Sequence, residues 1–405
     1  RGALVGPSAA TGVWDEFVTE HPESRWAWQA AGLLSSTAFG AAGKFKTGWL
    51  TDEVLEAQRQ KTFQPLPAEE ASLAERQAVE WLLAHQRPDG SWISPAERSN
   101  VDSLEPNEFT LAITAICGQA LLGYGADEHA DAVEHALEAV ISIHDLFRSR
   151  VPVRYFMDYG VWSRAYLLGF LVECTVQGVR EHDELADRIR KVIEELGERQ
   201  KPDGGWSYYV TADLGSSTSP PLPSMTFTTA AVLLPLLRAH DEGFAVPEQS
   251  IERGLDLLEA ARNQNGTFEY MLSPGIGSIV AGAAGRGPVC TLALLHGGRA
   301  EVDDLRTALE LFAQHRGTYM RERGKSLMHC GSEGQGSHYL TFDYAYAAQA
   351  VRLLPSGERG RYRAAVLESV LSGRSEEGSY LDNPLIGWAL GTAFAVWAFQ
   401  ALGAF

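Results

Sequence analysis

The sequence is poor in basic residues, and this shortage limits the partners that it can bind. Lysine and arginine number 34 against 52 aspartates and glutamates, which gives a formal net charge of −18 at pH 7. Nucleic acids and anionic membrane surfaces are recognised through a basic face. We therefore expect no nucleic-acid partner and no binding driven by an anionic membrane, and the acidic surface mainly favours solubility.

Cysteine is scarce as well. The chain has four cysteines, far apart, and three of them lie in apolar stretches: Cys117, Cys174 and Cys290. A disulfide framework needs clustered pairs in a short chain, so we expect buried, reduced thiols and favour the cytoplasm over export. Arg1 rather than Met begins the sequence, so an upstream targeting peptide would not be visible. Apolar residues make up 45% of the chain, which is enough for one large core.

The dominant feature of the sequence is a repeat. Gln86-Arg-Pro-Asp-Gly-Ser-Trp92 returns as Gln200-Lys-Pro-Asp-Gly-Gly-Trp206, and each copy follows an amphipathic segment. Pro-Asp-Gly predicts a turn that ends a helix, because its glycine can adopt a positive φ. Shorter copies, a glycine and then an aromatic residue, occur at 266–268, 317–319 and 378–380. The copies lie about 57 residues apart if one without the signature falls near position 149, and this spacing predicts six helical hairpins.

Each hairpin combines a helix that has one polar face with a helix that is apolar all round. The polar-faced helices begin near Ala68, Ala126, Asp183, Val246, Ala300 and Glu358. The apolar helices cover residues 109–122, 161–176, 227–237, 287–295, 342–354 and 385–402. A helix of the first kind can face solvent, whereas a helix of the second kind must be covered on all sides.

Exposed and covered helices that alternate in this way close most simply into a double ring. We therefore predict an all-α fold, an (α/α)6 toroid, over residues 66–405, and no strand is required. The uncharged stretch 385–405 would by itself pass as a membrane span, but as the sixth inner helix it is covered by the ring. Residues 1–65 are expected to form an N-terminal extension and a short helical appendage.

Helical hairpins that end in Gln-x-Pro-Asp-Gly-x-Trp resemble the repeats of squalene-hopene cyclases, related terpene cyclases and the β subunits of protein prenyltransferases. The resemblance covers about residues 66–405. It implies an enzyme that holds an apolar isoprenoid ligand in the central cavity, and it leaves open a peripheral membrane contact for substrate uptake. Toroids of this kind also include non-catalytic binders and glycan-degrading enzymes, so the motif indicates the fold more specifically than the activity.

In such a ring the inner helices begin at one mouth of the cavity, where their free N–H groups and partial positive charge point inward. The expected catalytic acids at these starts are Glu105, Glu108, Asp158, Asp343 and Asp382. The expected substrate-binding residues are Tyr159, Trp162, Arg164, Arg286, His338, Tyr344, Tyr346 and Trp388. We expect most of the charged members to line one shared cavity, although a carboxylate at such a place can also cap a helix. An arginine inside an apolar helix needs a carboxylate partner or an anionic ligand.

The first chemistry that the resemblance suggests is that of a class II cyclase. That family opens an inner helix with Asp-x-Asp-Asp followed by Thr, and its middle Asp is the proton donor. This chain has Glu105-Pro-Asn-Glu108-Phe-Thr110, in which Asn replaces the middle acid. Acid-initiated cyclisation would therefore depend on Glu108 or Asp158, kept protonated by burial, with aromatic faces stabilising the carbocation.

The second chemistry is zinc-dependent prenyl transfer, in which the family holds the ion with an Asp-x-Cys pair and a His. The best-placed donors here are Cys290, His338 and Asp343, but Pro288 stands where that family has Asp. A site with one ligand missing holds zinc weakly, so we expect no metal and no other cofactor. The third alternative is a non-catalytic protein that binds its ligand in the cavity.

Overall fold

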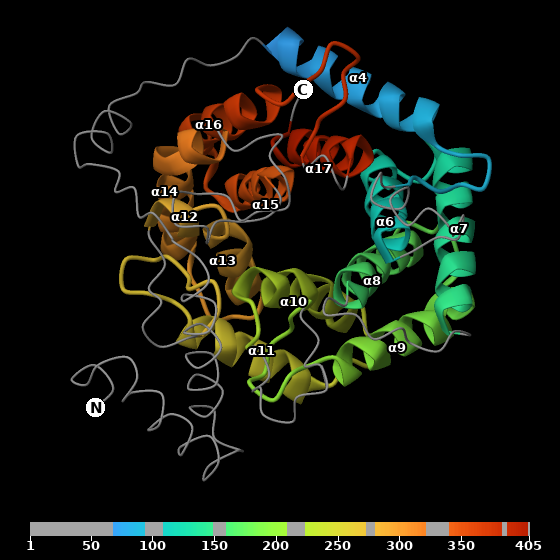
Figure 1. Ribbon diagram of the computed structural model, residues 1–405, viewed down its shortest axis with the longest axis horizontal. Helices are drawn as coiled ribbons and strands as arrows, with labels where there is room; N and C mark the ends of the chain where they lie inside the picture. Colours follow the sequence, from blue (N-terminus) through green and yellow to red (C-terminus); the bar gives the residue numbers. More distant parts are fainter. Residues whose placement is uncertain are drawn as a thin grey trace, which may run out of the picture.

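The computed structural model of the chain describes residues 68–93, 108–148, 159–208, 223–272, 280–320, 340–382 and 387–403. The appendage expected at 1–65 lies outside them. Within these residues the chain forms two concentric rings of helices (Figure 1). The outer ring consists of α4 (Ala68–His85), α7 (Ala130–Arg148), α9 (His182–Glu198), α11 (Glu248–Ala260), α14 (Val302–Met320) and α16 (Arg359–Leu371). The inner ring consists of α6 (Glu108–Leu122), α8 (Gly160–Val176), α10 (Thr226–Asp241), α13 (Gly287–His296), α15 (Leu340–Leu353) and α17 (Trp388–Ala401).

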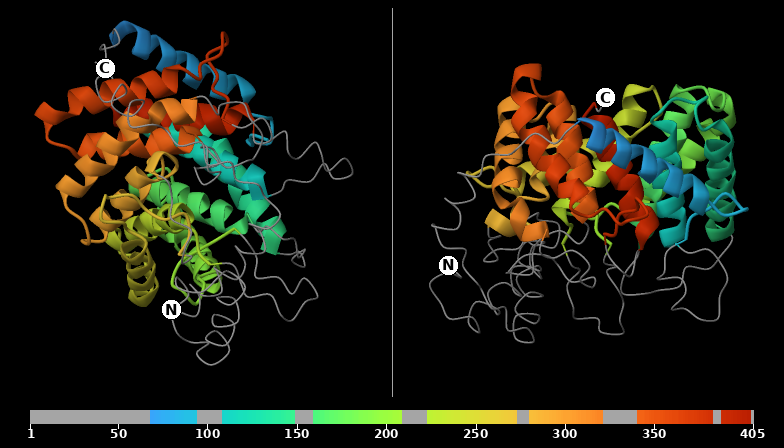
Figure 2. Two further views of the ribbon diagram at one scale, coloured as in Figure 1. Left: turned by 60° about the vertical axis from the view of Figure 1, so that its left-hand side comes forward. Right: turned by 90° about the horizontal axis from the view of Figure 1, so that it is seen from above.

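The inner ring is closed. Each inner helix packs against the next one along the chain, and the last, α17, packs against the first, α6. Every inner helix also packs on an outer helix, and α4 completes the outer ring by covering α17. In the side views of Figure 2 the helices of both rings span the thickness of the toroid. The predicted (α/α)6 toroid is therefore confirmed; a short helix, α12 (Val280–Ala283), and a 3-10 turn, η2 (Ser356–Glu358), are additions to it.

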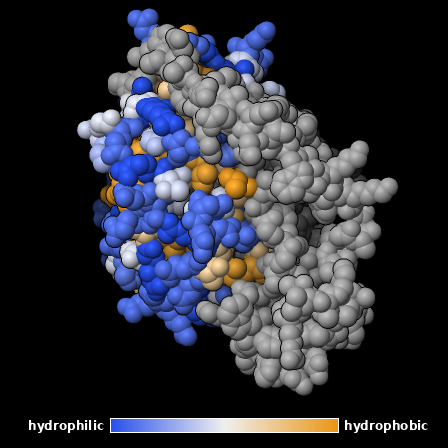
Figure 3. Space-filling model, turned by 90° about the vertical axis from the view of Figure 1, so that its left-hand side faces the viewer, coloured by the Kyte–Doolittle hydropathy of each residue, from blue (hydrophilic) through white to orange (hydrophobic). Residues whose placement is uncertain are grey.

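The two rings differ in the way that the sequence pattern predicts. Outer helix α9 buries one apolar stripe, which consists of Leu185, Ile189, Val192, Ile193 and Leu196. Inner helices such as α8 and α17 are buried along nearly their whole length. Hydrophilic side chains cover most of the described outer surface seen in Figure 3, with small apolar patches between them. No helix in the described part of the chain is long and apolar enough to cross a membrane.

The repeated motif joins each outer helix to the inner helix that follows it. The indole N–H of Trp92 donates to the Leu82 carbonyl at 2.9 Å, and that of Trp206 to the Leu196 carbonyl at 2.8 Å. The backbone N–H of each tryptophan donates to a threonine of the next inner helix, at 3.2 Å and 3.0 Å respectively. Gln86 and Gln200 each bridge two carbonyl groups, one of them on the next outer helix. The two copies are equivalent in structure as well as in sequence.

Glycine is required in the turn between the two helices. Gly90 has a φ of 81° and Gly204 a φ of 98°, a backbone conformation that side chains with a Cβ rarely adopt. A Cβ on Gly90 would lie 2.1 Å from the His135 carbonyl oxygen, and one on Gly204 would lie 2.4 Å from that of Arg253. The turn thus packs directly on the backbone of the next outer helix.

One repeat copy was predicted wrongly. Gly317 and the two residues after it lie inside α14, which continues to Met320, whereas Gly266 and Gly378 lie in turns with positive φ, as expected. The helix does not stop at Gly317 because no Pro-Asp precedes that glycine, and because Arg316, one residue earlier, is still packed against α16 through Glu368. A glycine followed by an aromatic residue is too short a pattern to predict a turn.

Candidate active site

Aromatic side chains meet at the centre of the inner ring. They are Trp162 and Tyr166 of α8, Phe227 of α10, Phe342 and Tyr346 of α15, and Phe394 and Trp397 of α17, and we call them the aromatic cluster. The Trp162 and Phe342 ring centroids lie 5.5 Å apart, although α8 and α15 stand on opposite sides of the ring (Figure 1). This contact therefore crosses the lumen of the toroid.

Phe342 is the hub of the aromatic cluster. Its ring centroid lies 4.6 Å from that of Tyr346 and 5.9 Å from that of Phe394, with near-perpendicular or tilted planes. Such edge-to-face arrangements are favourable for aromatic pairs. The centre of the lumen is therefore lined mainly by aromatic carbon. The polar atoms of the aromatic cluster are the hydroxyls of Tyr166 and Tyr346 and the indole N–H groups of Trp162 and Trp397.

A small cavity of about 30 Å³ adjoins the aromatic cluster near the amino-terminal ends of α6 and α8. Its lining consists of Glu108, Phe109, Ala112, Ile113, Ile116, Tyr159, Trp162, Tyr166, Leu390 and Phe394. Glu108 is the one carboxylate among them, and its side chain is 29% exposed. An acid therefore stands at the rim of an apolar, aromatic space.

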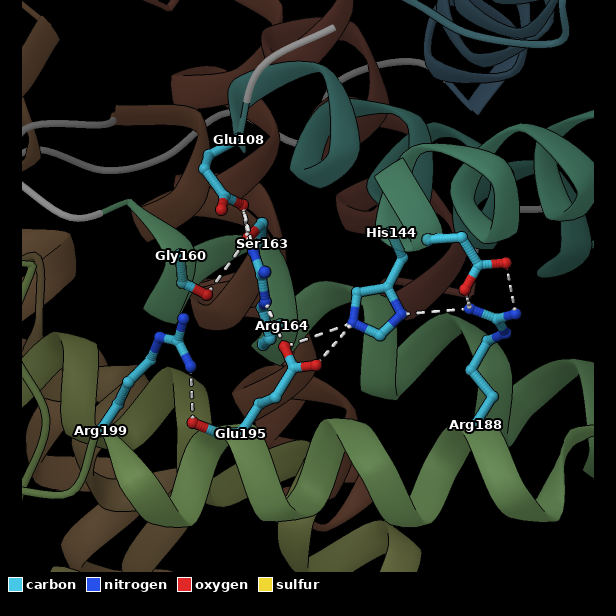
Figure 4. Close-up of polar contacts among 9 residues, drawn as sticks. Glu108, His144, Gly160, Ser163, Arg164, Arg188, Glu195 and Arg199 are labelled. Carbon is cyan, nitrogen blue, oxygen red and sulfur yellow. Dashed lines mark hydrogen bonds and ion pairs between the residues drawn. The ribbon is translucent and has the colours of Figure 1, made fainter. Parts of the chain in front are cut away.

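Glu108 is the first residue of α6, and α8 holds its carboxylate. The Ser163 hydroxyl and the Arg164 guanidinium both donate to the same carboxylate oxygen (Figure 4). Arg164 is only 4% exposed, and its Nε also donates to Glu195 of α9 at 2.8 Å. One buried guanidinium is thus shared between an acid at the lumen and an acid of the outer ring.

The network continues to the protein surface through His144 of α7 (Figure 4). His144 Nε2 lies 3.1 Å from Glu195, and its Nδ1 lies 3.2 Å from Nη1 of Arg188. A guanidinium can only donate hydrogen bonds, so Nδ1 accepts and the ring proton resides on Nε2. Arg188 in turn makes two hydrogen bonds with Asp145, at 2.8 and 2.9 Å.

Electrostatics keeps the middle of this network charged. Burial would lower the pKa of the Arg164 guanidinium, but the charges of Glu108 and Glu195 and its hydrogen bonds to them raise that pKa. Burial would likewise raise the pKa of Glu195, yet hydrogen bonds from His144 and Arg164 and the Arg164 charge lower it to about 2. Arg164 therefore has two carboxylate partners, Glu108 and Glu195, which agrees with the expectation that an arginine inside an apolar helix needs a carboxylate or an anionic ligand.

A second buried group lies between α10, α13 and α15. Arg286 is fully buried, and its Nε donates to the Phe268 carbonyl at 2.9 Å. Burial raises the pKa of the nearby Cys290 thiol to about 12; Arg286 and a hydrogen bond with Thr226 oppose this shift, and the Asp343 charge adds to it. The structure thus brings together three residues that the sequence placed near one mouth, but all three are buried in the wall of the ring.

Asp382 caps a helix to which it does not belong. Its carboxylate accepts hydrogen bonds from the backbone N–H groups of Leu340 and Thr341, at 2.9 and 3.0 Å, and from the Thr341 hydroxyl. These groups begin α15, so the capping alternative describes the contacts of Asp382. Burial raises the pKa of Asp382 to about 6, although these hydrogen bonds act in the opposite direction.

The remaining predicted residues lie in different surroundings. Tyr159 stacks on Tyr208 at the rim of the small cavity, with ring centroids 5.7 Å apart. Tyr344 faces the outer ring, 6.0 Å from Phe312 of α14, and Trp388 is 39% exposed at the start of α17. Three further predicted residues lie outside the described residues: Glu105, Asp158 and His338.

Of the described charged residues that were expected at one cavity, Glu108 lines the small cavity. Arg164, Arg286, Asp343 and Asp382 make three different sets of contacts, and none of them lines the small cavity. Successive helical residues point in directions about 100° apart, so residues near a helix start face the lumen, a neighbouring inner helix or the outer ring. Proximity to the start of an inner helix therefore does not place a side chain in the lumen.

Sequence reasoning missed some of the central residues. Phe227, Phe342, Phe394 and Trp397 belong to the aromatic cluster, and Trp162 with Tyr166 and Phe342 with Tyr346 repeat an i, i+4 spacing that could have indicated a shared helix face. Glu195 and His144 come from outer helices, and no pattern in the sequence connects them to Glu108. Within the described residues no three His, Cys, Asp or Glu side chains gather as a metal site would require.

The sequence comparison agrees with the architecture. Residues 109–278 match the sequence profile of the squalene-hopene cyclase C-terminal domain, so the resemblance stated above is confirmed over this part of the chain. No functionally curated protein matches the sequence at a significant level.

Solved structures with the same fold belong to enzymes of different kinds. A variant of the type II terpene cyclase MstE from Scytonema, with its product merosterolic acid A, has a TM-score of 0.53 at 16% identity, covering 84% of this chain and 99% of that one. A GH76A alpha-1,6-mannanase from Salegentibacter sp. has a TM-score of 0.52 at 14% identity, with 83% and 98% covered. An unsaturated glucuronyl hydrolase from Streptococcus agalactiae has a TM-score of 0.53 at 12% identity, with 84% and 92% covered. At these identities the likeness shows the fold and does not decide between a cyclase and a hydrolase.

Proposed function

We propose that this chain is a terpenoid cyclase-like enzyme, which binds an apolar isoprenoid in the lumen of the toroid and starts its cyclisation by protonating a carbon–carbon double bond. The observation that carries the proposal is the aromatic cluster with the Glu108 carboxyl group at its rim. A carbocation needs an environment that stabilises positive charge and contains no water to trap it. The aromatic cluster supplies the ring faces, and the close contacts between its rings leave little room for water beside them.

The aromatic rings stabilise the cation through their faces. A cation over an aromatic ring gains about 0.5–2 kcal/mol, with the larger values in desolvated sites. Trp162 and Phe394 each contact Phe342, and the three rings come from three inner helices. A cation that migrates along a folded polyene between these helices stays close to a ring. The substrate displaces these side chains as it binds, because the small cavity of about 30 Å³ is much smaller than known small-molecule sites, which measure about 300–1,000 Å³.

Glu108 acts as the general acid in its protonated form, which carries the proton on the carboxyl oxygen that Ser163 and Arg164 do not contact. Its proton adds to one carbon of the double bond, the other carbon becomes cationic, and the next double bond attacks that carbon to form a ring. Loss of a proton from the last cation ends the reaction and balances the proton that was added. The hydrogen bonds from Ser163 and Arg164 stabilise the carboxylate that the first step leaves behind. Because Arg164 also donates a hydrogen bond to Glu195, the guanidinium charge is shared between two carboxylates.

The test is turnover of linear isoprenoids by wild type and by Glu108→Gln. Glutamine retains an acceptor for Ser163 and Arg164 but carries no acidic proton, so the variant should fold and should lose at least about 100-fold in rate, the scale of general acid catalysis. Purified protein is incubated with squalene and with geranylgeraniol, and the extract is analysed by gas chromatography with mass spectrometry. Glu80→Gln, an exposed change on α4, is the matched control and should retain activity.

Cyclised products from wild type that are missing with Glu108→Gln support the proposal. Equal product from both proteins would assign the acid elsewhere. Binding of the probes without any turnover by wild type would instead favour the non-catalytic alternative.

A further inference from the structure

The lumen also opens at the opposite end, where the inner helices finish. Two adjoining cavities, with volumes of about 270 and 400 Å³, lie there and share five lining residues: Gln119, Glu173, His296, Gln349 and Trp397. Together their linings include residues from the last turns of all six inner helices. We call this region the carboxyl-terminal mouth. Its volume is of the order of known small-molecule sites, which measure about 300–1,000 Å³.

The carboxyl-terminal mouth leads inward to the aromatic cluster. Tyr166 lines both the 270 Å³ cavity and the small cavity that contains Glu108. Leu234, Pro235 and Tyr346 make the inner part of the mouth apolar. The same opening is therefore polar outside and apolar inside, and Tyr166 is the side chain that separates it from the small cavity beside Glu108.

The outer part of the mouth offers hydrogen-bonding groups that the described protein does not use. Gln119 of α6 and Gln349 of α15 are half-buried, and the structure gives neither amide a hydrogen bond within its described residues. The indole N–H of Trp397 is buried and likewise has no partner there. Buried polar groups in proteins nearly always have a partner, so the buried indole N–H, with the two half-buried amides beside it, indicates a place for a ligand that can both donate and accept hydrogen bonds.

The formal charges that line the mouth balance in number: they are those of Arg238 and Arg352 against those of Glu173 and Asp241. Arg238 is held by Glu173 at 2.9 Å and by Glu242 at 2.5 Å. Burial lowers the pKa of His296, although Asp241 opposes the shift, so this ring adds no positive charge at neutral pH. The carboxyl-terminal ends of the inner helices add partial negative charge. A diphosphate binds where several cations or N–H groups converge, and this mouth provides no such excess.

We propose that the carboxyl-terminal mouth binds the uncharged, hydrogen-bonding head group of an amphipathic isoprenoid, such as an alcohol or a phenol, while the hydrocarbon chain extends inward to the aromatic cluster. This inference rests on the proposed function and names its substrate class. A sugar fits less well, because the aliphatic inner wall of Leu234 and Pro235 offers no partners for further hydroxyl groups. Gln119 and Gln349 face the head group, and Tyr166 contacts the start of the chain.

The experiment measures the binding of geranylgeraniol and of geranylgeranyl diphosphate by equilibrium dialysis with radiolabelled probes. Wild type should bind the alcohol at least about tenfold more tightly than the diphosphate, because no excess cation compensates the anionic group. Gln349→Leu should weaken alcohol binding about three- to tenfold, which is the effect of one lost neutral hydrogen bond. Gln249→Leu makes the same change on the exposed surface of α11 and should leave both affinities unchanged.

Equal or tighter binding of the diphosphate would overturn this inference, and so would wild-type affinity in Gln349→Leu. Cyclisation of squalene, which has no head group, separates this failure from that of the proposed function. Turnover of squalene without any preference for the alcohol would leave the cyclase proposal standing and remove the head-group site. Tight alcohol binding without turnover of either probe would retain the site and remove the cyclase chemistry.

Discussion

Glu195 should contribute to stability in a way that depends on pH, and Glu195→Gln isolates this contribution. The change keeps the size of the side chain and an acceptor for Arg164 but removes the charge. The pKa of Glu195 falls from its ordinary value of 4.5 to about 2 in the folded protein, which corresponds to about 3 kcal/mol. We expect the ionised Glu195 side chain to contribute about 2 kcal/mol to the free energy of unfolding, because 17% of it is exposed and solvent screens the interaction.

The sign of the pH dependence follows from the direction of the shift. The folded protein holds the ionised carboxylate more strongly than the unfolded chain does, so the stabilisation is complete above about pH 5 and is lost as the pH falls toward 2. The free energy of unfolding of wild type should exceed that of Glu195→Gln by about 2 kcal/mol at pH 7. Linkage predicts that this difference shrinks by about 0.8 kcal/mol at pH 4.

Urea unfolding followed by circular dichroism at pH 7 and pH 4 measures both differences. Groups that titrate alike in the two proteins cancel, and Glu80→Gln, at an exposed position, should differ from wild type by less than about 0.5 kcal/mol at either pH. A difference between wild type and Glu195→Gln that stays constant or grows on acidification would refute the buried ion network.

Three further outcomes are expected. Gly90→Ala should lower the free energy of unfolding in urea by about 3 kcal/mol or more, because its Cβ would lie 2.1 Å from a carbonyl oxygen. Gly178 has a similar φ and open space around it, so Gly178→Ala should lower the same free energy by about 1 kcal/mol. Phe342→Leu should fold but should cyclise about five- to tenfold more slowly in initial-rate assays, since one aromatic face is lost at the hub of the aromatic cluster; an unchanged rate would count against carbocation stabilisation. Elemental analysis should find well below one zinc per chain in both wild type and Cys290→Ser. Zinc binds the thiolate form of cysteine, and burial raises the pKa of the Cys290 thiol to about 12. One zinc per chain in wild type that is lost in the variant would support prenyl transfer.

The fold could be predicted because the sequence signals are local and repeated. Gln86, Gly90 and Trp92 each make a contact that their counterparts in the second copy also make. The apolar runs coincide with inner helices because a helix that is covered on every side needs apolar residues on every side. Gly317 shows the limit of this reasoning, since a two-residue pattern without Pro-Asp did not end its helix.

The candidate site could be predicted only in outline, because the inner helices are apolar on every side. An inner helix that is apolar all round carries no stripe to show which face meets the lumen, so Trp162 in the aromatic cluster and Tyr344 against the outer ring were indistinguishable in the sequence. Glu108 was found from its place at a helix start. Glu195 and His144 reach it from other hairpins, and only the folded arrangement shows that they share Arg164.

The most direct measurement of the central claim follows the proton. Wild type and Glu108→Gln are incubated with squalene and geranylgeraniol in D2O after full exchange, and the products are analysed by mass spectrometry. Acid-initiated cyclisation predicts a cyclised product from wild type that carries one deuterium on carbon at the site of protonation, and no such product from Glu108→Gln. Cyclised product that carries no deuterium, or equal deuterated product from both proteins, would contradict protonation by Glu108 in the lumen of the toroid.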